Sequence, residues 1–250
     1  MNYNPYSLEG KLILVTGASS GIGRATAIEC SKLGAQLIIT ARNEERLKET
    51  LGQLEGEGHI YIVADLADTK QVETLVDAID GKLDGVVSNA GVVSTIPVAF
   101  YKEQDIEEMF RTNTFSMMML TKLLVKKKKM NKPASIVYTA SIGNVYSAGV
   151  GNGIYGATKC AIDGFMRTVA LELAPKEIRC NSVNPGMVHT NIMDSNGRIT
   201  AEQFEEDMKT YPLRRYGRPE EIAWAIIYLL SDASAWVTGT ALKIDGGVTI

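Results

Sequence analysis

Histidine and cysteine are both scarce in this chain of 250 residues. The three cysteines, Cys30, Cys160 and Cys180, form no CxxC pair, and their odd number leaves at least one thiol free in the monomer. Such usage suits a reducing compartment better than a disulfide framework. The only histidines are His59 and His189. We therefore expect no zinc site built on His/Cys spacing, and a general base other than a histidine pair.

The chain also lacks long hydrophobic runs and a strong excess of either charge. Its longest apolar run, residues 222–230, is too short to span a bilayer, and residues 1–10 show neither a basic region nor a long apolar stretch. The net charge is −3, with one basic run at residues 126–129. We therefore expect a cytoplasmic protein with neither a membrane nor a nucleic acid as partner.

The sequence does contain enough apolar side chain for one large globular core, because 45% of its residues are hydrophobic. The 23 glycines and 7 prolines are too few for a low-complexity or collagen-like chain. No linker rich in serine, proline or glycine and no internal repeat divides the chain. The prediction is a single domain over residues 1–250.

Short apolar runs alternate with amphipathic stretches along the chain. Strands are expected at residues 12–15, 36–40, 60–63, 85–87, 135–139, 180–183 and 241–244. Helices are expected at residues 22–33, 44–54, 69–79, 103–125, 155–173 and 219–230. This alternation predicts the α/β class, with a doubly wound Rossmann-type parallel sheet of about seven strands and helices on both faces.

The least regular segment runs over residues 186–215 and carries a polar, helix-like stretch at residues 201–209. Long connections in compact domains are more often functional than idle. We therefore expect a substrate flap over a site, with an ordinary surface loop as the alternative.

A glycine-rich sequence joins the first strand to the first helix. Gly17, Gly21 and Gly23 stand between residues 12–15 and the helix that begins near Ile22. Glycines there permit a tight turn and the close approach of a pyrophosphate, which then lies at the positive end of the helix. This junction predicts a dinucleotide site, although an ordinary glycine-rich turn would look similar.

Several motifs occur in an order that resembles the short-chain dehydrogenase/reductase family. The glycine-rich loop has the family's TGxxxGxG spacing, and SNAG differs from the family's NNAG by one serine. A YxxxK motif follows, with a serine 14 positions before its tyrosine. The full set covers nearly the whole chain: TGxxxGxG at 16–23, SNAG at 88–91, Ser141, YGATK at 155–159, NPG at 184–186 and DGG at 245–247.

The resemblance implies an enzyme that acts on CH–OH groups with NAD(P), and four catalytic residues. Tyr155 and Lys159 are four apart, so on a helix they project from one face. The lysine ammonium and an oxidised nicotinamide would both stabilise the phenolate and lower a pKa that is ordinarily about 10. Ser141 follows a strand and would hydrogen-bond the substrate oxygen, with Ser147 as a competing candidate. Asn113 corresponds to the family's fourth catalytic residue, which supports a proton path from the lysine.

The end of the second strand governs the choice of cofactor. Ala41 stands where an acidic residue would bind the adenosine ribose of NAD, and Arg42 follows, whose guanidinium can bind a 2′-phosphate. NADP(H) is therefore preferred. NAD(H) remains possible, because Ser20 is not the additional basic residue that many NADP-dependent relatives carry in the loop. Glu44 and Glu45 are interpreted as first-turn helix residues after an Asn43 cap.

The resemblance also supplies a wider set of cofactor-binding positions. Asp65 corresponds to an adenine contact, Asn89 to a residue lining the cofactor, and Thr190 to a contact with the nicotinamide amide. The full expected set is Gly17, Ser19, Ser20, Gly21, Ile22, Gly23, Arg42, Asp65, Leu66, Asn89, Ala90, Gly91, Tyr155, Lys159, Pro185, Gly186, Val188 and Thr190.

The preferred prediction is NADPH-dependent reduction of a ketone to a secondary alcohol by a small-molecule oxidoreductase. One alternative is a 3-oxoacyl-(acyl-carrier-protein) reductase, since the basic run at residues 126–129 could attract an acidic carrier. Another is a regulatory protein that binds nucleotide without turnover, against which the complete catalytic set argues. By resemblance, the chain is expected to form a homo-oligomer, a tetramer assembled through the long helices and the last strand.

Overall fold

The computed structural model describes residues 3–189 and 201–250, without the side chains of residues 201, 202 and 204. Its centre is a seven-stranded sheet in the order β3-β2-β1-β4-β5-β6-β7, and every neighbouring pair is parallel. This confirms the predicted doubly wound α/β sheet. The strands are β1 Leu12–Thr16, β2 Gln36–Ala41, β3 Ile60–Val63, β4 Leu83–Ser88, β5 Met130–Thr139, β6 Ile178–Pro185 and β7 Ala241–Ile244.

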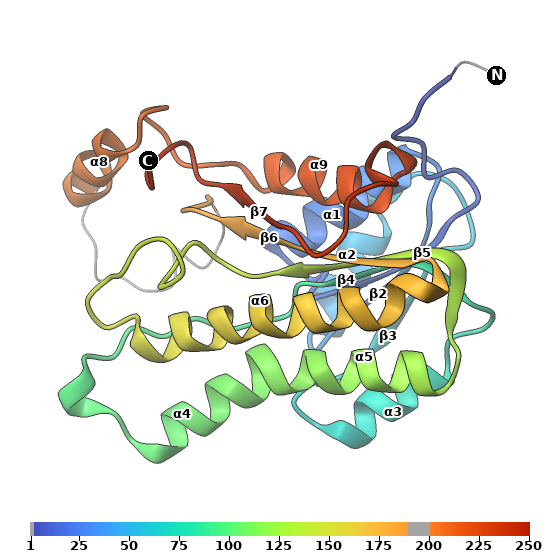
Figure 1. Ribbon diagram of the computed structural model, residues 1–250, viewed down its shortest axis with the longest axis horizontal. Coiled ribbons are helices and arrows are strands. Elements are labelled where there is room, and N and C mark those ends of the chain that lie inside the picture. Colours follow the sequence, from blue (N-terminus) through green and yellow to red (C-terminus); the bar gives the residue numbers. More distant parts are fainter. Residues whose placement is uncertain (1–2, 190–200) are drawn as a thin grey trace.

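Helices cover both faces of the sheet (Figure 1). One layer holds α1, α2 and α9, and the other holds α3, α4, α5 and α6. The helices are α1 Gly21–Lys32, α2 Glu44–Leu51, α3 Thr69–Asp77, α4 Glu103–Phe110, α5 Ser116–Lys126, α6 Gly153–Leu173, α8 Ala201–Thr210 and α9 Pro219–Leu230. None of the helices within residues 3–189 and 201–250 has the length and apolar character needed to cross a membrane.

The strands read as continuous apolar runs because both faces of the sheet are covered. Alternate side chains of one strand enter two different cores. Leu14 and Ile38 pack with the layer of α3, α5 and α6, whereas Ile13 and Leu37 pack with the layer of α1 and α9. Side-chain alternation thus fixes which face of each strand meets which helices.

The predicted helix over residues 103–125 is not continuous, and this prediction was wrong in that respect. The structure divides it into α4, a π-helical turn at Arg111–Phe115, and α5. The π turn carries Asn113, whose side chain is buried and bonds outside the helix. The spacing of apolar residues predicts a helix from its average period, and a single π-helical turn changes that period too little to be recognised.

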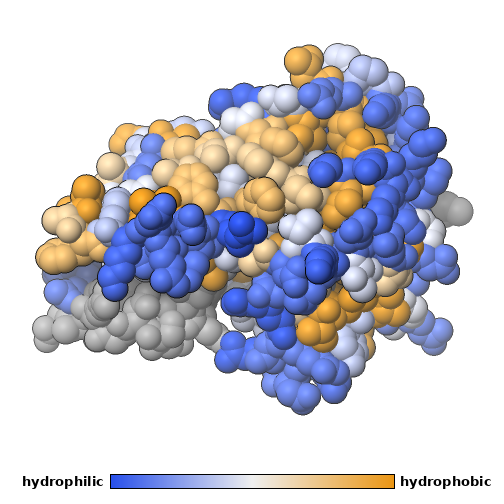
Figure 2. Space-filling model, turned by 90° about the horizontal axis from the view of Figure 1, so that it is seen from below, coloured by the Kyte–Doolittle hydropathy of each residue, from blue (hydrophilic) through white to orange (hydrophobic). Residues whose placement is uncertain are grey.

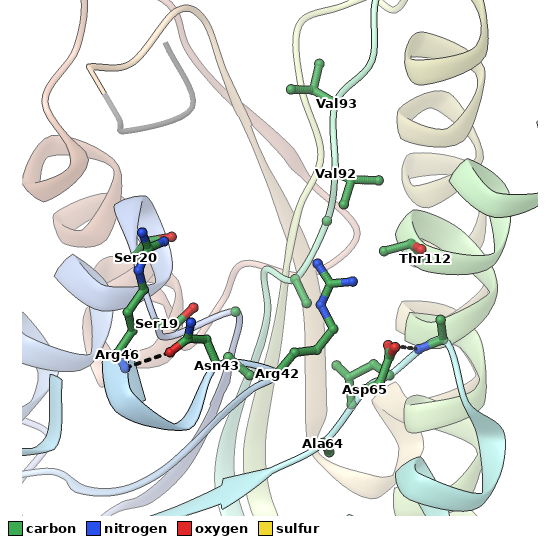
Figure 3. A pocket seen from close by; sticks show the side chains of 16 residues that line it. Ser19, Ser20, Arg42, Asn43, Arg46, Ala64, Asp65, Val92, Val93 and Thr112 are labelled. Carbon is green, nitrogen blue, oxygen red and sulfur yellow. Dashed lines mark hydrogen bonds between the residues drawn. The ribbon is translucent and has the colours of Figure 1, made fainter. Parts of the chain in front are cut away.

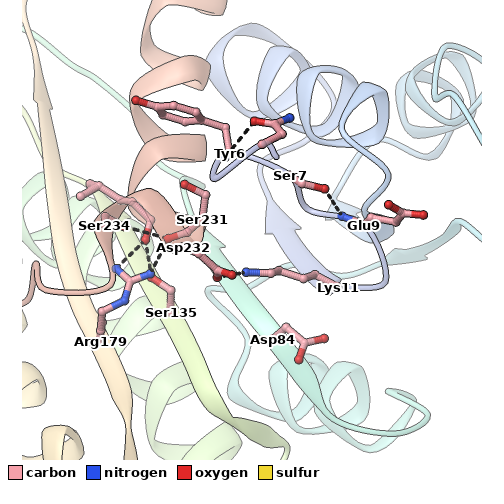
Figure 4. A network of polar contacts seen from close by, with 12 residues as sticks. Tyr6, Ser7, Glu9, Lys11, Asp84, Ser135, Arg179, Ser231, Asp232 and Ser234 are labelled. Atoms are coloured by element: carbon pink, nitrogen blue, oxygen red, sulfur yellow. Dashed lines mark hydrogen bonds and ion pairs between the residues drawn. The ribbon is translucent and has the colours of Figure 1, made fainter. Parts of the chain in front are cut away.

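A buried polar network fastens the end of α9 to the sheet (Figure 4). Arg179 of β6 donates hydrogen bonds to the carbonyl oxygens of Leu229 at 2.8 Å, Ser231 at 3.2 Å and Val237 at 3.4 Å. Ser135 of β5 also donates to the Leu229 carbonyl, at 2.7 Å. The last carbonyls of α9 thus receive the cation and donors that a helix C-terminus favours.

The strand order reverses direction at β1, which pairs with β2 on one side and β4 on the other. The connections leaving β1 and β4 run to opposite faces of the sheet, so a crevice opens beyond their carboxyl ends. The motif-bearing loops after β1, β2, β3 and β4 all meet at this crevice.

Candidate active site

The glycine-rich loop after β1 is held against the loop after β4. Gly17 has a φ of +66°, and a Cβ atom added to it would lie 2.9 Å from the Cα of Ala90. A Cβ atom on Gly23 would lie 2.3 Å from the Gly17 carbonyl oxygen. Thr16 Oγ1 accepts hydrogen bonds from the backbone N–H groups of Asn89 at 2.9 Å and Ala90 at 3.1 Å. Glycine is therefore required at both positions, one for its conformation and one for close approach.

A cavity of about 500 Å³ lies beside this loop (Figure 3). Its walls come from the loops after β1, β2, β3 and β4 together with one residue of the π turn. Half of the lining was predicted from the sequence as cofactor-binding, namely Gly17, Ser19, Ser20, Arg42, Asp65, Leu66, Ala90 and Gly91. The other half was not predicted, namely Ala41, Asn43, Arg46, Ala64, Ala67, Val92, Val93 and Thr112.

The remaining predicted cofactor residues do not line this cavity. Gly21, Ile22 and Gly23 form the first turn of α1, and Asn89 packs against Gly17 and Gly23. The others follow the second half of the sheet or belong to α6, namely Tyr155, Lys159, Pro185, Gly186 and Val188. Thr190 lies outside the described residues, as do residues 190–200 of the expected flap.

Arg46 is the most consequential lining residue that sequence reasoning missed. Two side chains hold its helix, α2, against the glycine-rich loop. Arg24 donates to the carbonyl oxygens of Ser19 at 2.7 Å and Arg46 at 3.3 Å. Thr50 donates to the carbonyl oxygen of Ala18 at 2.9 Å. In Figure 3 the Arg46 side chain extends toward Ser20. Among the described residues, no carboxylate pairs with its guanidinium, whereas Arg24 pairs with Glu49.

The interpretation of Asn43 as a helix cap is confirmed, because its side chain accepts a hydrogen bond from the Arg46 backbone N–H at 2.9 Å. This cap begins α2 one residue after Asn43. Arg42 and Arg46 are four positions apart on either side of that start. The signal by which Arg46 could have been found in the sequence was therefore its place in the first turn of the helix that follows Arg42.

Ser141, Tyr155 and Lys159 meet at the carboxyl end of β5. Lys159 is buried, its Nζ donates to the Thr139 carbonyl at 2.9 Å, and it lies 5.7 Å from the centroid of the Tyr155 ring. Tyr155 is half-buried, and its ring and the Ser141 hydroxyl both lie beside Gly143. The Ser141 hydroxyl also accepts from the Gly143 backbone N–H at 3.0 Å. The structure thus brings three of the four predicted catalytic residues together.

Asn113 lies close to this group and joins it to the cavity wall. Its Oδ1 accepts from the Val92 backbone N–H at 2.7 Å, and its Nδ2 donates to the Val92 carbonyl at 2.9 Å. Nδ2 also donates to Thr158 Oγ1 at 3.1 Å. A Cβ atom on Gly91 would lie 3.1 Å from Asn113 Oδ1 and 3.5 Å from Lys159 Nζ. The absence of a side chain at Gly91 thus leaves space beside these two buried polar groups, next to the cavity wall.

Comparison with known proteins places this arrangement in a family. The family model described as enoyl-(acyl carrier protein) reductase matches residues 17–249. A 3-oxoacyl-(acyl-carrier-protein) reductase, FabG, of Thermotoga maritima is 33% identical over 97% of this chain and 99% of its own length. A tropinone reductase homolog of Arabidopsis thaliana is 32% identical over 98% of this chain and 93% of its own length.

Solved structures agree with these relatives. A short-chain dehydrogenase/reductase family protein is 31% identical with a TM-score of 0.85 over 98% of this chain and 100% of its own. The NADP active-site complex of RhlG from Pseudomonas aeruginosa is 29% identical with a TM-score of 0.91 over 99% and 100% of the two chains. The chain belongs to the short-chain dehydrogenase/reductase family. It is an oxidoreductase that acts on CH–OH groups with NAD(P).

In this short-chain dehydrogenase/reductase, burial sets the protonation of the two central groups. Burial raises the pKa of Tyr155, and its hydrogen bond with Ser141 lowers it in part. Burial lowers the pKa of Lys159 to about 8, against the charge of Asp163, which raises it. Desolvation of the phenolate thus dominates among the protein's own groups, and the lowering expected from the ammonium together with an oxidised nicotinamide stays a prediction.

The residues of the cavity fit a phosphorylated dinucleotide. The α1 N-terminus has no side-chain cap at Ser20, so its first N–H groups remain available to a pyrophosphate. Gly17 and Gly23 leave no room for a side chain where the loop is closest. Arg42 and Arg46 add two cationic side chains to the same wall. The donor set is thus suited to a ligand with several anionic groups.

Two of the four lysines in the basic run at the end of α5 have partners within the fold. Lys127 pairs with Asp77 at 2.6 Å and Glu73 at 3.1 Å, and Lys129 donates to the Ile79 carbonyl at 2.6 Å. These contacts fasten α5 to α3. The charge of this run is thereby partly neutralised, which weakens its attraction for an acidic partner.

Proposed function

We propose that this short-chain dehydrogenase/reductase reduces a ketone to a secondary alcohol with NADPH. The observation that carries the proposal is the convergence of Ser141, Tyr155 and Lys159 at one strand end, beside a cavity with two arginines. A protein that only binds nucleotide has no use for a buried lysine next to a half-buried phenol.

The protein groups have separate parts in the proposed reaction. When bound, NADPH supplies the hydride that adds to the carbonyl carbon. The Ser141 hydroxyl hydrogen-bonds the substrate oxygen and stabilises the charge that develops on it. Tyr155, whose raised pKa keeps it protonated at neutral pH, donates its proton to that oxygen. Lys159, with Asn113 beside it, replaces the proton on Tyr155.

The preference for NADP(H) over NAD(H) rests on the wall after β2. Ala41 offers no carboxylate to a ribose hydroxyl, and Arg42 and Arg46 offer two guanidinium groups to a 2′-phosphate. Arg46 extends toward Ser20, the loop position at which a basic residue was missing from the sequence. Two solved relatives, from Pseudomonas aeruginosa and Burkholderia cenocepacia, are described as complexes with NADP.

A 3-oxoacyl-(acyl-carrier-protein) reductase is the second candidate, favoured by relatives of that name at 32–34% identity. The reaction at the ketone would be the same, so the two candidates differ only in how the substrate is delivered. Initial rates with a 3-oxoacyl chain on acyl-carrier protein, on coenzyme A and as a simple ester separate them. A much higher kcat/KM for the carrier-bound chain would favour the carrier substrate.

We also propose that residues 1–250 form one dinucleotide-binding domain, with residues 186–215 as a substrate flap. Both described ends of the flap are fastened: Val188 bridges Gly217, and the Leu213 N–H donates to the Gly246 carbonyl at 3.2 Å. The cytoplasmic location and the absence of nucleic acid and membrane partners remain predictions.

A homotetramer is proposed as the assembly. Figure 2 shows the face on which α4 and α5 lie, and apolar residues run across its middle. Exposed apolar side chains of this part of the chain include Ile106 of α4 and Phe115 of the π turn. Apolar surface of this kind is typical of subunit interfaces.

Titration with NADPH and NADH, followed by oxidation of NADPH across a panel of ketones, tests the function. We expect tighter binding of NADPH, and a loss of turnover in Tyr155→Phe of roughly 100-fold or more, since the proton donor is removed. Equal turnover in Tyr155→Phe would overturn the mechanism. Preference for NADH would overturn the assignment of the arginines.

A further inference from the structure

A buried carboxylate, Asp163, lies one helical turn beyond Lys159 on α6 and has no part in the reaction described above. Its residue is 3% exposed, and it faces β6 rather than solvent. Burying a carboxylate is costly unless hydrogen bonds and a nearby opposite charge compensate it. Its position next to the catalytic groups therefore calls for a physical reason.

The hydrogen bonds of Asp163 lead to Ser141. Asn184 of β6 donates one amide hydrogen to Asp163 Oδ2 at 2.7 Å and the other to the Ser141 carbonyl at 3.0 Å. Asn184 is wholly buried, and both its amide hydrogens are used. Without an acceptor at Asp163, the Asn184 amide could rotate and release the backbone that carries the Ser141 hydroxyl.

The charge of Asp163 acts on Lys159. The Lys159 ammonium bonds the Thr139 carbonyl on β5, so Asp163 influences it through space and not through a hydrogen bond. The other groups that face the two charges are the Tyr155 phenol and the Cys160 thiol on α6, and Ser182 on β6, which donates to Asp163 Oδ1 at 2.6 Å. Two influences on the pKa of Lys159 oppose each other. The Asp163 charge raises it, and burial, which is the larger influence, lowers it to about 8.

We propose that Asp163 is a positioning residue of the active site, which orients Asn184 to hold the Ser141 backbone and supplies the negative charge that balances the Lys159 ammonium. The proposal rests on the proposed function, in which Ser141 binds the substrate oxygen and Lys159 serves Tyr155. A carboxylate that only fastened α6 to β6 would influence stability without influencing the titration of Lys159.

The variant Asp163→Asn tests the charge with little change of size. The Lys159 ammonium then loses its proton at lower pH, because burial is no longer opposed. The alkaline fall of kcat/KM for ketone reduction is expected to move by about one unit toward lower pH. The alkaline loss of NADPH affinity, measured by fluorescence titration without turnover, is expected to move with it, since the ammonium attracts the anionic ligand. A fall in kcat of roughly tenfold is expected from the loosened Ser141.

The matched control is Ser182→Ala, which removes the other hydrogen bond to Asp163, and a longer one of 3.4 Å to Asn184 Oδ1, and keeps the Asp163 charge. Both alkaline limits are expected to stay in place in this variant while stability falls. If Asp163→Asn does not fold, Asp163→Glu replaces it, and the expected result is unchanged limits with a lower kcat. Unchanged limits in Asp163→Asn, or limits that move equally in Ser182→Ala, would overturn the proposal. Full turnover in Tyr155→Phe would instead overturn the proposed function.

Discussion

Lys159 carries a charged side chain that is almost completely buried, so desolvation favours the loss of its proton. Folding lowers its pKa from 10.5 to about 8. Between these two values the unfolded chain binds more protons than the folded chain, so the folded state gains stability as the pH rises from about 8 to about 10.5. Below pH 8 both states carry the proton, and the cost of burying the charge is present in full.

Substitution of Lys159 by methionine is expected to remove this pH-dependent gain. The wild type should gain on the order of 2–3 kcal/mol over Lys159→Met in the free energy of unfolding between pH 8 and 10.5. Urea unfolding of both proteins at three pH values in that range measures the difference. Groups that titrate in both proteins cancel in the comparison, and parallel stability curves would contradict the burial argument.

Arg46 is expected to contribute to NADPH affinity and not to NADH affinity. Its guanidinium lines the cavity without a carboxylate partner among the described residues. We expect Arg46→Gln to weaken NADPH binding by about 3–10-fold and Arg42→Gln by about 10–100-fold, consistent with the loss of charge-assisted hydrogen bonds. Fluorescence titrations with both cofactors give the two constants.

The control for Arg46→Gln is Arg167→Gln, since Arg167 is exposed on α6 and does not line the cavity. An equal loss of NADH affinity in Arg46→Gln would mean that the residue supports α2 rather than a phosphate. No loss for either cofactor would remove Arg46 from the site.

Some residue roles could be predicted from the sequence and others could not. The glycine loop, Arg42, Ser141, Tyr155 and Lys159 could be proposed as site residues because short sequence motifs contain or adjoin them. Arg46 and Asp163 were missed because their roles depend on where a side chain lies after folding. No periodicity in the sequence states that α2 packs on the glycine-rich loop.

At the scale of the element, all seven strands and the main helices were predicted from apolar patterning, with ends displaced by a few residues. The strand β5 begins at Met130 and not at residue 135. Its first part was missed in the sequence because it is partly polar and partly exposed. The π turn between α4 and α5 was missed because the contacts that stabilise it are distant in the sequence: the Asn113 side chain bonds the backbone of Val92. Tertiary contacts of this kind override local helical preference.

The end of α9 provides a prediction about stability alone. Arg179→Met leaves the carbonyls of Leu229, Ser231 and Val237 without their guanidinium donor. We expect a loss of about 2–4 kcal/mol, because these acceptors lie in a partly buried region. For a chain of this length that loss corresponds to a decrease in Tm of roughly 4–16 °C.

Differential scanning calorimetry of Arg179→Met and of the exposed control Arg167→Met measures this effect. NADPH affinity is expected to be unchanged in both variants, since neither residue lines the cavity. A decrease in Tm of the same size in the control would contradict the role assigned to the network.

At the scale of the whole molecule, the proposed tetramer predicts a particle of four times 27.2 kDa. Light scattering after size exclusion measures this mass directly. We expect Phe115→Glu, on the helical face, to lower the mass, because a charge would be buried in the interface. Tyr3→Glu, at an exposed N-terminal position, should leave it unchanged. A monomeric wild type would contradict the assembly.

Of the residues that the structure describes, those lining the cavity fall between 17 and 112, whereas Asn113, Ser141, Tyr155 and Lys159 all come later in the chain. The proposed recognition of the 2′-phosphate of NADP and the proposed chemistry at the ketone thus belong to successive portions of the chain. A lineage could exchange NADPH for NADH by a few changes after β2 and retain its reaction intact. Equally, it could acquire a new substrate through changes in the second portion alone and continue to use the same reduced cofactor.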